Sequence, residues 1–522
     1  MWRSAILIVL LAFSANAQES QLGRVEFPTS GSPQAQAHFL RGLAALHSFW
    51  YEEAVEAFRE STKVDPNFMM GYWGEAMTYN HPLWSEQDPA AARLVLAKIK
   101  DSSKLTDRER AYLNAVKVLY GEGDKRARDT AYSTAMEKIY KAYPDDLDAA
   151  AFYSLSLLGL VRSEDKNYRL QARAGAIALD VYQKNPNHPG AAHYIIHAFD
   201  DPEHAILALP AARRYASIAP EAHHARHMPS HIFLQLGMWP EAAASNEAAW
   251  ESSDAWMRRK NLSLNVRDYH SLHWLMYAYL QQGRYKKAEE LLMLMKKVMS
   301  ESTYDNKLRP GYYENNWANM AAAFIVETER WNLVSELFPE GKQSTEQTGS
   351  NGMHASHDAT VRTSNASQNL PIFIRGWAAA LNGSAFELGS IRAINKWEVE
   401  ALLASMKKDH ATAIDLMKKA TAREEEIGAP YGPPNLIKPS HELFGEILLR
   451  AGQPREAIEK FQAALLRQPN RARSLLGLAR AAAQSGDRFT AATTAVKLLD
   501  QWKQADADLP ELKEIREFVR LN

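Results

Sequence analysis

The feature that most constrains the fold is a pattern of small, aromatic and proline residues that recurs in units of 34 residues. The clearest unit carries it at Gly42, Ala54, Phe58 and Pro66, and it returns at Gly445, Ala457, Phe461 and Pro469, with shorter matches at Gly237–Ala242 and Gly283–Ala288. A unit of this length suits two antiparallel amphipathic helices joined by a tight turn. Glycine and alanine then lie where the helices touch, and proline ends the second helix because it lacks an N–H. The chain is therefore predicted to be all-α.

This pattern resembles the tetratricopeptide repeat (TPR) family of the exported bacterial type, and the resemblance extends over most of the chain. It implies a right-handed α-solenoid of stacked helix-turn-helix units. It also implies a concave groove in which a protein, a peptide or a small ligand binds. The fold by itself does not name that ligand, because function depends on particular sites.

The first 17 residues have the pattern of a secretory signal peptide. Arg3 precedes an apolar run, Ala5–Phe13, and Ala15-Asn16-Ala17 forms an A-x-A cleavage site. The run is too short to cross a hydrocarbon layer of about 30 Å. We expect cleavage after Ala17 and export, with a periplasm as the best fit. No later segment approaches transmembrane length, so we expect none in the mature chain.

A polar stretch divides the remainder of the chain. Residues 339–370 include Gln343–Gly352, which has almost no large apolar side chain and cannot offset its ordering entropy. We expect a flexible insertion there. It separates an N-terminal TPR-like solenoid with a histidine-rich groove, residues 18–338, from a C-terminal TPR-like solenoid, residues 371–522.

Composition and motifs exclude several functions. Lys and Arg total 61 against 62 Asp and Glu, so no basic field favours nucleic acid. Cysteine is absent, which excludes thiolate metal sites, iron–sulfur clusters and a cysteine nucleophile. The sequence has no H-E-x-x-H, G-x-S-x-G or G-x-x-x-x-G-K-[ST] motif. We therefore assign no reaction, and any metal must be bound by His, Asp, Glu or backbone oxygen.

Histidines are concentrated in one part of the chain. Ten of the 17 lie between residues 188 and 273. His193 pairs with His197, and His227 with His231, each at the i,i+4 spacing that puts two imidazoles on one helical face. The second pair follows the first by 34 residues, so both pairs occupy the same places in consecutive units.

The resemblance implies that certain positions of each unit's first helix line the concave groove. In this sequence those positions hold His47, Trp73, His81, His193, His197, His224, His227, His231, His270, His273 and Tyr277. The predicted ligands of a divalent metal are His193, His197, His227, His231 and His273, with Asp200 and Glu203 nearby as oxygen ligands or hydrogen-bond acceptors. A register counted from Ala205 keeps the first pair in the groove but removes its match to the second. Pro229 must lie in the first turn of a helix.

Three interpretations remain open from the sequence. If the histidines bind a metal, zinc suits imidazole and carboxylate ligands, and copper is the alternative. If they form a structural cluster joined by hydrogen bonds, no ion is needed. In the first interpretation, the chain binds a ligand in its groove, directly or through a metal. In the second it is a metal-dependent enzyme, and in the third it is an assembly scaffold. Metal analysis of the purified protein separates the second interpretation from the others, and a pull-down from the native envelope separates the third from the first.

Overall fold

The computed structural model describes residues 21–520, apart from 101–102, 163–164, 166, 301–310, 340–365 and 435. The predicted signal peptide and nearly all of the predicted insertion lie outside the described residues. Helices dominate the described part, where the one sheet consists of the antiparallel strands β1 (Asn80–His81) and β2 (Glu86–Gln87). The prediction of an all-α fold is confirmed.

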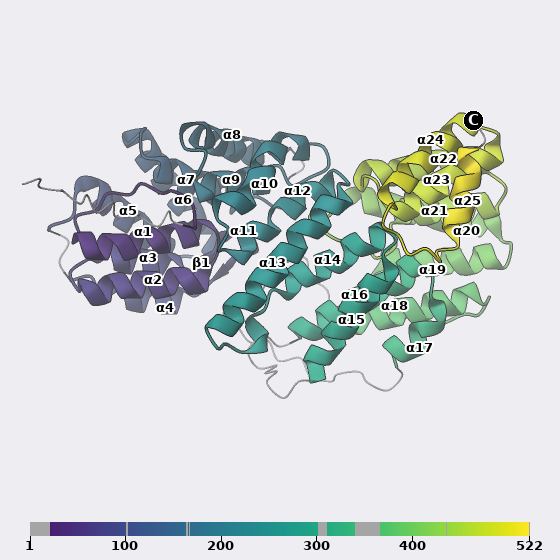
Figure 1. Ribbon diagram of the computed structural model, residues 1–522, viewed down its shortest axis with the longest axis horizontal. Coiled ribbons are helices and arrows are strands. Elements are labelled where there is room, and N and C mark those ends of the chain that lie inside the picture. The colour runs from purple at the N-terminus through teal and green to yellow at the C-terminus, as the bar shows by residue number, and fades with distance from the viewer. Residues whose placement is uncertain are drawn as a thin grey trace, which may run out of the picture.

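The helices follow one another along an elongated stack that runs from the purple N-terminal end to the yellow C-terminal end in Figure 1. The first part comprises α1 (Pro33–His47), α2 (Tyr51–Val64), α3 (Met69–Met77), η1 (Pro82–Trp84), α4 (Pro89–Leu96), α5 (Asp107–Leu119), α6 (Lys125–Ala142), α7 (Leu147–Leu158) and α8 (Arg169–Lys184). The middle comprises α9 (Pro189–Ala198), α10 (Ala205–Ile218), α11 (His223–His227), α12 (Pro229–Gln235), α13 (Trp239–Arg259), η2 (Leu264–Val266), α14 (Tyr269–Gln281), α15 (Tyr285–Ser300), α16 (Tyr312–Thr328), η3 (Trp331–Leu333) and α17 (Val334–Leu337). The last part comprises α18 (Ala366–Leu381), α19 (Ala393–Met406), α20 (His410–Glu426), α21 (Ser440–Arg450), α22 (Pro454–Arg467), α23 (Ala472–Ser485), α24 (Arg488–Gln501) and α25 (Glu511–Val519).

Packing between helices is that of a solenoid. Helix α1 packs on α2 and α3, and α21 packs on α22 and α23, so each helix touches the next one and the next but one. Helix α1 also contacts α9, which lies several helices further along the chain. This contact closes the first turn of the stack and brings the end of α1 to the histidine-rich helices.

The repeated glycines allow helices to approach a buried phenylalanine. A Cβ atom added to Gly42 would lie 2.8 Å from the Phe58 ring, and one added to Gly74 would lie 2.3 Å from it. Near the other end of the chain, a Cβ added to Gly477 would lie 2.2 Å from Phe461. These distances are too short for any side chain, which explains the small residues in the 34-residue pattern.

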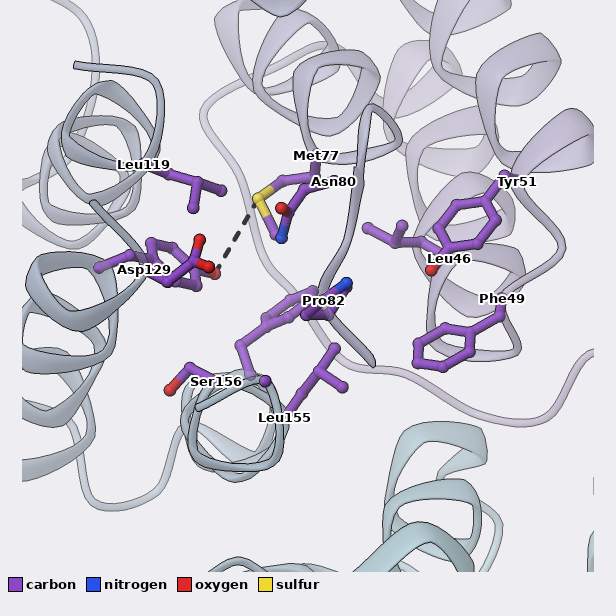
Figure 2. Close-up of a pocket in the computed structure, with 13 residues that line it drawn as sticks. Leu46, Phe49, Tyr51, Met77, Asn80, Pro82, Leu119, Asp129, Leu155 and Ser156 are labelled. Carbon is purple, nitrogen blue, oxygen red and sulfur yellow. Dashed lines mark hydrogen bonds between the residues drawn. The ribbon is translucent and has the colours of Figure 1, made fainter. Parts of the chain in front are cut away.

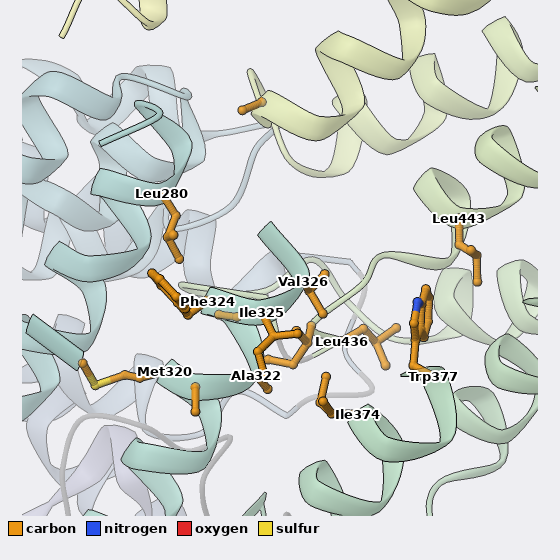
Figure 3. Packing of buried hydrophobic residues seen from close by; sticks show 14 of the residues in the cluster. Leu280, Met320, Ala322, Phe324, Ile325, Val326, Ile374, Trp377, Leu436 and Leu443 are labelled. Carbon is orange, nitrogen blue, oxygen red and sulfur yellow. The ribbon is translucent and has the colours of Figure 1, made fainter. Parts of the chain in front are cut away.

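The core consists mainly of two apolar clusters along the stack. One cluster occupies the N-terminal helices, and the larger one extends from the middle helices to the C-terminal end. Figure 3 shows part of the larger cluster, where Phe324, Ile325 and Val326 of α16 lie near Ile374 and Trp377 of α18. The residues on either side of the predicted insertion therefore share one core.

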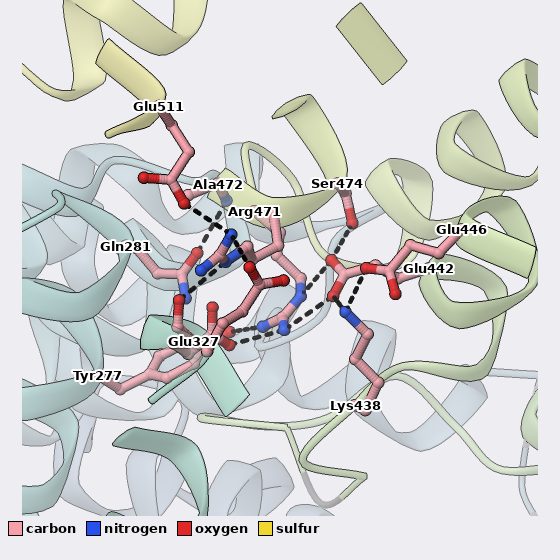
Figure 4. A network of polar contacts seen from close by, with 12 residues as sticks. Tyr277, Gln281, Glu327, Lys438, Glu442, Glu446, Arg471, Ala472, Ser474 and Glu511 are labelled. Carbon is pink, nitrogen blue, oxygen red and sulfur yellow. Dashed lines mark hydrogen bonds and ion pairs between the residues drawn. The ribbon is translucent and has the colours of Figure 1, made fainter. Parts of the chain in front are cut away.

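A buried ionic network ties the C-terminal helices to the middle of the molecule (Figure 4). The Arg471 guanidinium is fully buried and lies 2.7 Å from Glu442 Oε2 and 2.6 Å from Glu327 Oε1. It also donates to the Tyr277 hydroxyl at 2.8 Å. Lys438 Nζ lies 2.8 Å from Glu442 Oε1 on the other side. Because Tyr277 belongs to α14 and Glu327 to α16, this network fixes the position of α21 and α23 on the solenoid.

Two findings concern the predicted insertion and membrane-spanning segments. Helix α18 begins at Ala366, so residues 366–370, which the sequence assigned to the insertion, form the first turns of a helix. In the described part of the chain, no helix combines the length and the apolar character needed to cross a membrane.

Candidate metal centre

The histidine-rich helices have well-defined starts. Helix α9 begins with Pro189, and the ring of the preceding His188 accepts a hydrogen bond from the Ala191 N–H at 3.2 Å. Helix α14 is capped by Asp268, whose carboxylate accepts from the Ser271 N–H at 3.0 Å. A side chain that accepts from the third residue is a typical helix N-cap. These caps fix where each histidine falls on its helix.

Pro229 does not separate the second histidine pair. Helix α11 ends at His227 and α12 begins at Pro229, but Met228 between them has helical angles of φ −54° and ψ −35°. The Met228 N–H donates to the His224 carbonyl at 2.9 Å, and the path of the chain stays helical. His227 and His231 therefore remain one turn apart on the same face.

The first histidine set consists of His193 and His197 on α9 and His224 on α11. The Nε2 atom of His193 lies 3.1 Å from Nε2 of His197 and 3.1 Å from Nε2 of His224. Ligand atoms of all three residues lie within 4.8 Å of one another. His193 and His224 are buried, whereas His197 is half-buried.

The second histidine set consists of His227, His231 and His270, from α11, α12 and α14. His227 Nε2 lies 3.1 Å from His231 Nε2 and 3.0 Å from His270 Nε2. All three side chains are buried. The arrangement repeats that of the first set: an i,i+4 pair converges with one histidine from a neighbouring helix.

Hydrogen bonds at Nδ1 fix which nitrogen faces the centre of the second set. His227 Nδ1 lies 2.7 Å from Asn246 Oδ1, and the Asn246 amide is oriented because its Nδ2 donates to the Ala242 carbonyl at 2.8 Å. His231 Nδ1 lies 2.6 Å from the Asp200 carboxylate. Both Nδ1 atoms therefore carry a proton, and in the neutral ring each Nε2 is left with a lone pair.

The first set is oriented in the same way. His193 Nδ1 lies 2.7 Å from the main-chain carbonyl oxygen of His47, at the C-terminal end of α1. A carbonyl can only accept, so His193 donates from Nδ1 and presents the Nε2 lone pair to His197 and His224. The contact between α1 and α9 thus orients a candidate ligand.

Two neutral imidazoles with this proton arrangement cannot hydrogen-bond to each other. The Nε2 lone pairs of His227 and His231 face one another at 3.1 Å, with no proton between them. A cation between the rings removes this conflict. Zinc binds imidazole nitrogen at about 2.0–2.1 Å, which places tetrahedral nitrogen ligands about 3.4 Å apart, close to the spacing in both sets.

Burial keeps four of the six histidines neutral. It lowers the pKa of His193 and of His227 to about 3 in each case, with nearby histidines adding to the effect. Burial also lowers the pKa of His197 and of His270 well below the usual value. Neutral imidazole is the form that binds metal, so these four histidines are in the ligand form at neutral pH.

A third cluster, formed by His47, Asp148 and His188, differs from both sets because it places a carboxylate between two histidines. His47 Nε2 lies 2.9 Å from Asp148 Oδ1, and its Nδ1 lies 2.9 Å from the Tyr194 hydroxyl. His188 Nε2 lies 3.4 Å from the same carboxylate oxygen. Burial opposes ionisation of Asp148, but hydrogen bonds from His188 and His47 hold the pKa of its carboxyl below the usual range. Here each ring nitrogen that faces the carboxylate can donate to it.

Aromatic rings enclose both histidine sets. The Phe49 ring lies 4.3 Å from the His193 ring, and the Trp274 ring lies 4.3 Å from the His231 ring, measured between centroids. A Cβ atom added to Gly432 would lie 2.3 Å from Trp274. The extended segment around Gly432 therefore lies directly against the ring that covers the second set.

Phe49 has an unusual backbone conformation. Its φ is +53°, in the left-handed region that costs most side chains energy. The equivalent positions of four other units are glycines with positive φ, namely Gly237, Gly283, Gly452 and Gly486. On its other side, Phe49 lines a pocket with Tyr51 and Leu155 (Figure 2), in which the Tyr132 hydroxyl lies 3.9 Å from Met77 Sδ. The strained turn thus places a large ring between this pocket and the first set.

The structure regroups the five predicted ligands. Four of them, His193, His197, His227 and His231, divide between the two sets instead of forming one site. His273 belongs to neither set, although burial lowers its pKa to about 4. Its place is taken by His270, three residues earlier on α14. His224, which the sequence placed only on the groove wall, completes the first set.

Other predicted groove residues lie away from the histidine sets. Trp73 is buried in an aromatic core, with its ring 5.5 Å from Tyr112, so it offers no open face to a ligand. Tyr277 belongs to the Arg471 network. His81 stacks on Tyr51 at 4.0 Å between ring centroids.

Of the two predicted carboxylates, one contacts a histidine set. Asp200 accepts from His231, whereas Glu203 is exposed and outside both sets. Sequence reasoning missed Asn246, the His47 carbonyl and Phe49. A glycine position occupied by phenylalanine was the one signal in the sequence that could have indicated Phe49.

The fold defines a helical-repeat protein, and one unit has a recognisable family pattern. Residues 35–68 match the tetratricopeptide repeat family. Proteins built from such repeats typically bind partners through extended surfaces. A comparison with curated protein sequences finds no match.

Several solved structures are similar to this chain. The APC/C hetero-tetramer Cut9–Hcn1 shares 10% identity over 93% of this chain and 76% of that chain, with a TM-score of 0.34. The P58(IPK) TPR domain shares 12% identity over 94% and 98%, with a TM-score of 0.22. Yeast Tom70 shares 12% identity over 93% and 88%, with a TM-score of 0.28. The solenoid architecture itself is established by the helix order and packing described above.

Proposed function

We propose that this chain is a metal-binding solenoid protein in which each histidine set holds one transition-metal ion. Zinc is the proposed ion, and copper is the alternative. One observation carries the proposal: the Nε2 atoms of His227 and His231 lie 3.1 Å apart while both Nδ1 atoms face acceptors. Three nitrogen ligands and an open position are typical of metal sites that bind a further ligand.

The competing explanation is a structural cluster without metal. In the second set it requires His227 or His231 to be a buried imidazolium that donates from Nε2, because both Nδ1 atoms already donate. Burial opposes this charge and lowers the pKa of His227 and of His193 to about 3. A metal ion leaves every ring neutral and uses every lone pair, which favours the metal.

Metal stoichiometry tests the proposal. The full chain is stripped with a chelator, incubated with zinc or copper, desalted and analysed for metal by mass spectrometry. We expect two ions per chain. His197→Ala and His270→Ala should each retain one ion, because each removes a ligand from one set only. His273→Ala is the matched control, since His273 is a buried histidine outside both sets, and it should retain two. Failure of the wild-type chain to bind either metal contradicts the proposal.

Binding of a protein partner is a second candidate function. The repeat fold supports it in general terms. A specific observation is that helices α22 and α24 expose Leu466, Phe489 and Val496, which are 78%, 70% and 53% exposed. Cross-linking of the full chain in its native cells tests this function. Loss of a cross-linked product in a Phe489→Ser variant supports a partner at this face, and an unchanged set of products contradicts it.

We further propose that the protein acts after export. The pattern at Met1–Ala17 supports this proposal. The intact mass of protein isolated from the native cell envelope should correspond to a chain that begins at Gln18. A full-length species in the cytosol would contradict export.

A further inference from the structure

The two histidine sets lie side by side. The rings of His197 and His231 are 5.9 Å apart between centroids, and those of His224 and His227 are 6.0 Å apart. Rings within one set are only slightly closer: His193 and His224 lie 4.9 Å apart, and His227 and His231 lie 5.0 Å apart. Ions held by the two sets would therefore be close neighbours.

The protein compensates the charge of such a pair of ions only in part. In the described part of the chain, the residues grouped as ligands in both sets are all histidines. The Asp200 carboxylate reaches the second set only through His231. A second carboxylate, Asp268, is hydrogen-bonded to His223 and to the start of α14, and its charge also acts on His227 and His270. Two divalent ions in this buried site would thus carry about four positive charges against two nearby carboxylates, which burial makes costly.

The space around the sets limits what can supply the missing negative charge. Three nitrogen ligands leave each tetrahedral ion one open position. The Phe49 ring closes the side of the first set, and the Trp274 ring closes the side of the second set. Of the six histidines, only His197 is more than marginally exposed. A single oxygen atom is the anionic ligand that needs the least space in this enclosure.

We infer that the two ions share one small anionic oxygen ligand, hydroxide in the resting protein, which bridges the two histidine sets. This inference rests on the proposed metal binding and extends it from two separate sites to one dinuclear centre. The bridge completes four-coordination at both ions with one ligand. It also places the negative charge between the two positive ions.

Electron paramagnetic resonance with copper(II) as the probe tests the bridge. The full chain is stripped, loaded with copper(II) and desalted, and its copper content and integrated spin are measured on the same sample. Two copper ions joined by a single oxygen atom couple their unpaired spins. We therefore expect two ions per chain with most of the spin signal missing.

Single-set variants supply the controls. His270→Ala and His197→Ala should each bind one copper ion and give the full spin signal of one ion. His273→Ala should behave as the wild type. Two ions per chain with the full signal of two spins would overturn the bridge while leaving metal binding intact. A wild-type chain that retains no copper and no zinc would contradict the proposed metal binding, and the bridge would fall with it.

Discussion

At the scale of single residues, the site depends on where each imidazole carries its proton. His193, His227 and His231 each direct Nδ1 to an acceptor, and these acceptors differ: a main-chain carbonyl, an amide and a carboxylate. All three have the same effect, because each presents a lone pair on Nε2. Partners of this kind orient metal ligands and raise their basicity.

Asn246 offers a direct test of this orienting role. Replacing it with alanine removes the acceptor of His227 Nδ1 without removing a ligand. We expect Asn246→Ala to weaken metal binding at the second set by about 10- to 100-fold, as loss of such partners usually does. Competition with a chromogenic chelator measures the change. Asn316→Ala is the control, since Asn316 is also a buried helical asparagine and donates to a main-chain carbonyl four residues earlier, at 2.8 Å. Equal affinities for the two variants would contradict the role of Asn246.

The buried histidines also predict how the stability of the metal-free protein depends on pH. The folded chain holds the pKa of His193 and of His227 at about 3, whereas an unfolded histidine titrates near 6.5. Between these values the unfolded chain binds protons that the folded chain does not. The free energy of unfolding should therefore fall as pH decreases from about 6.5 towards 3, by on the order of 1 kcal/mol per pH unit for each histidine.

Thermal melts of chelator-treated protein between pH 7.5 and 4.5 measure this dependence. The wild type should melt at progressively lower temperature below pH 6.5. His227→Ala should show a shallower decrease, because it has one fewer depressed histidine. Identical slopes for the two proteins would show that His227 does not titrate as described.

At the scale of helices and turns, the structure explains what the sequence could and could not predict. The 34-residue pattern predicts helix pairs because glycine must lie beneath Phe58 and Phe461, a purely local requirement of packing. The i,i+4 spacing likewise predicts two histidines on one face. The third ligand of each set depends on how neighbouring helices rotate against each other. The rotation of α14 selects His270 and not His273, and no periodicity within one helix encodes that choice.

The turn between α1 and α2 provides a prediction at this scale. Phe49 and Lys408 both have positive φ, at +53° and +63°. Lys408→Gly should stabilise the fold by about 1 kcal/mol, because it relieves only backbone strain. Phe49→Gly relieves the same strain but loses a buried ring that contributes about 1.5–3 kcal/mol. We expect it to lower the melting temperature and to accelerate removal of metal by a chelator.

Chelator kinetics separate the two effects of Phe49. Lys408→Gly should lose metal at the wild-type rate, and Phe49→Gly should lose it several-fold faster from one set. If both variants release metal at the same rate, the Phe49 ring does not cover the first set.

At the scale of the whole molecule, a buried ion network joins the parts of the solenoid. Arg471 is enclosed by Glu442, Glu327 and Tyr277, which come from three different helices. The side chains before and after residues 340–365 also share one apolar cluster. The C-terminal helices are therefore expected to unfold together with the middle of the chain.

Arg471→Ala tests this connection. The substitution leaves two buried carboxylates without their cation, which should lower the free energy of unfolding by about 3–5 kcal/mol. Arg480→Ala is the control, because Arg480 pairs with Glu514 at 2.7 Å on a partly exposed surface, where a pair contributes about 0–1 kcal/mol. Chemical denaturation followed by circular dichroism measures both. Similar effects of the two substitutions would show that the Arg471 network does not hold the molecule together.

Anomalous diffraction tests the central claim most directly. Crystals of the full chain, grown with zinc or copper, are measured on both sides of the metal absorption edge. We predict two strong anomalous peaks. One should lie about 2.0–2.1 Å from the Nε2 atoms of His193, His197 and His224, and the other at that distance from the Nε2 atoms of His227, His231 and His270. The absence of peaks at both sets, in crystals whose histidines adopt the arrangement described here, would contradict the metal centre.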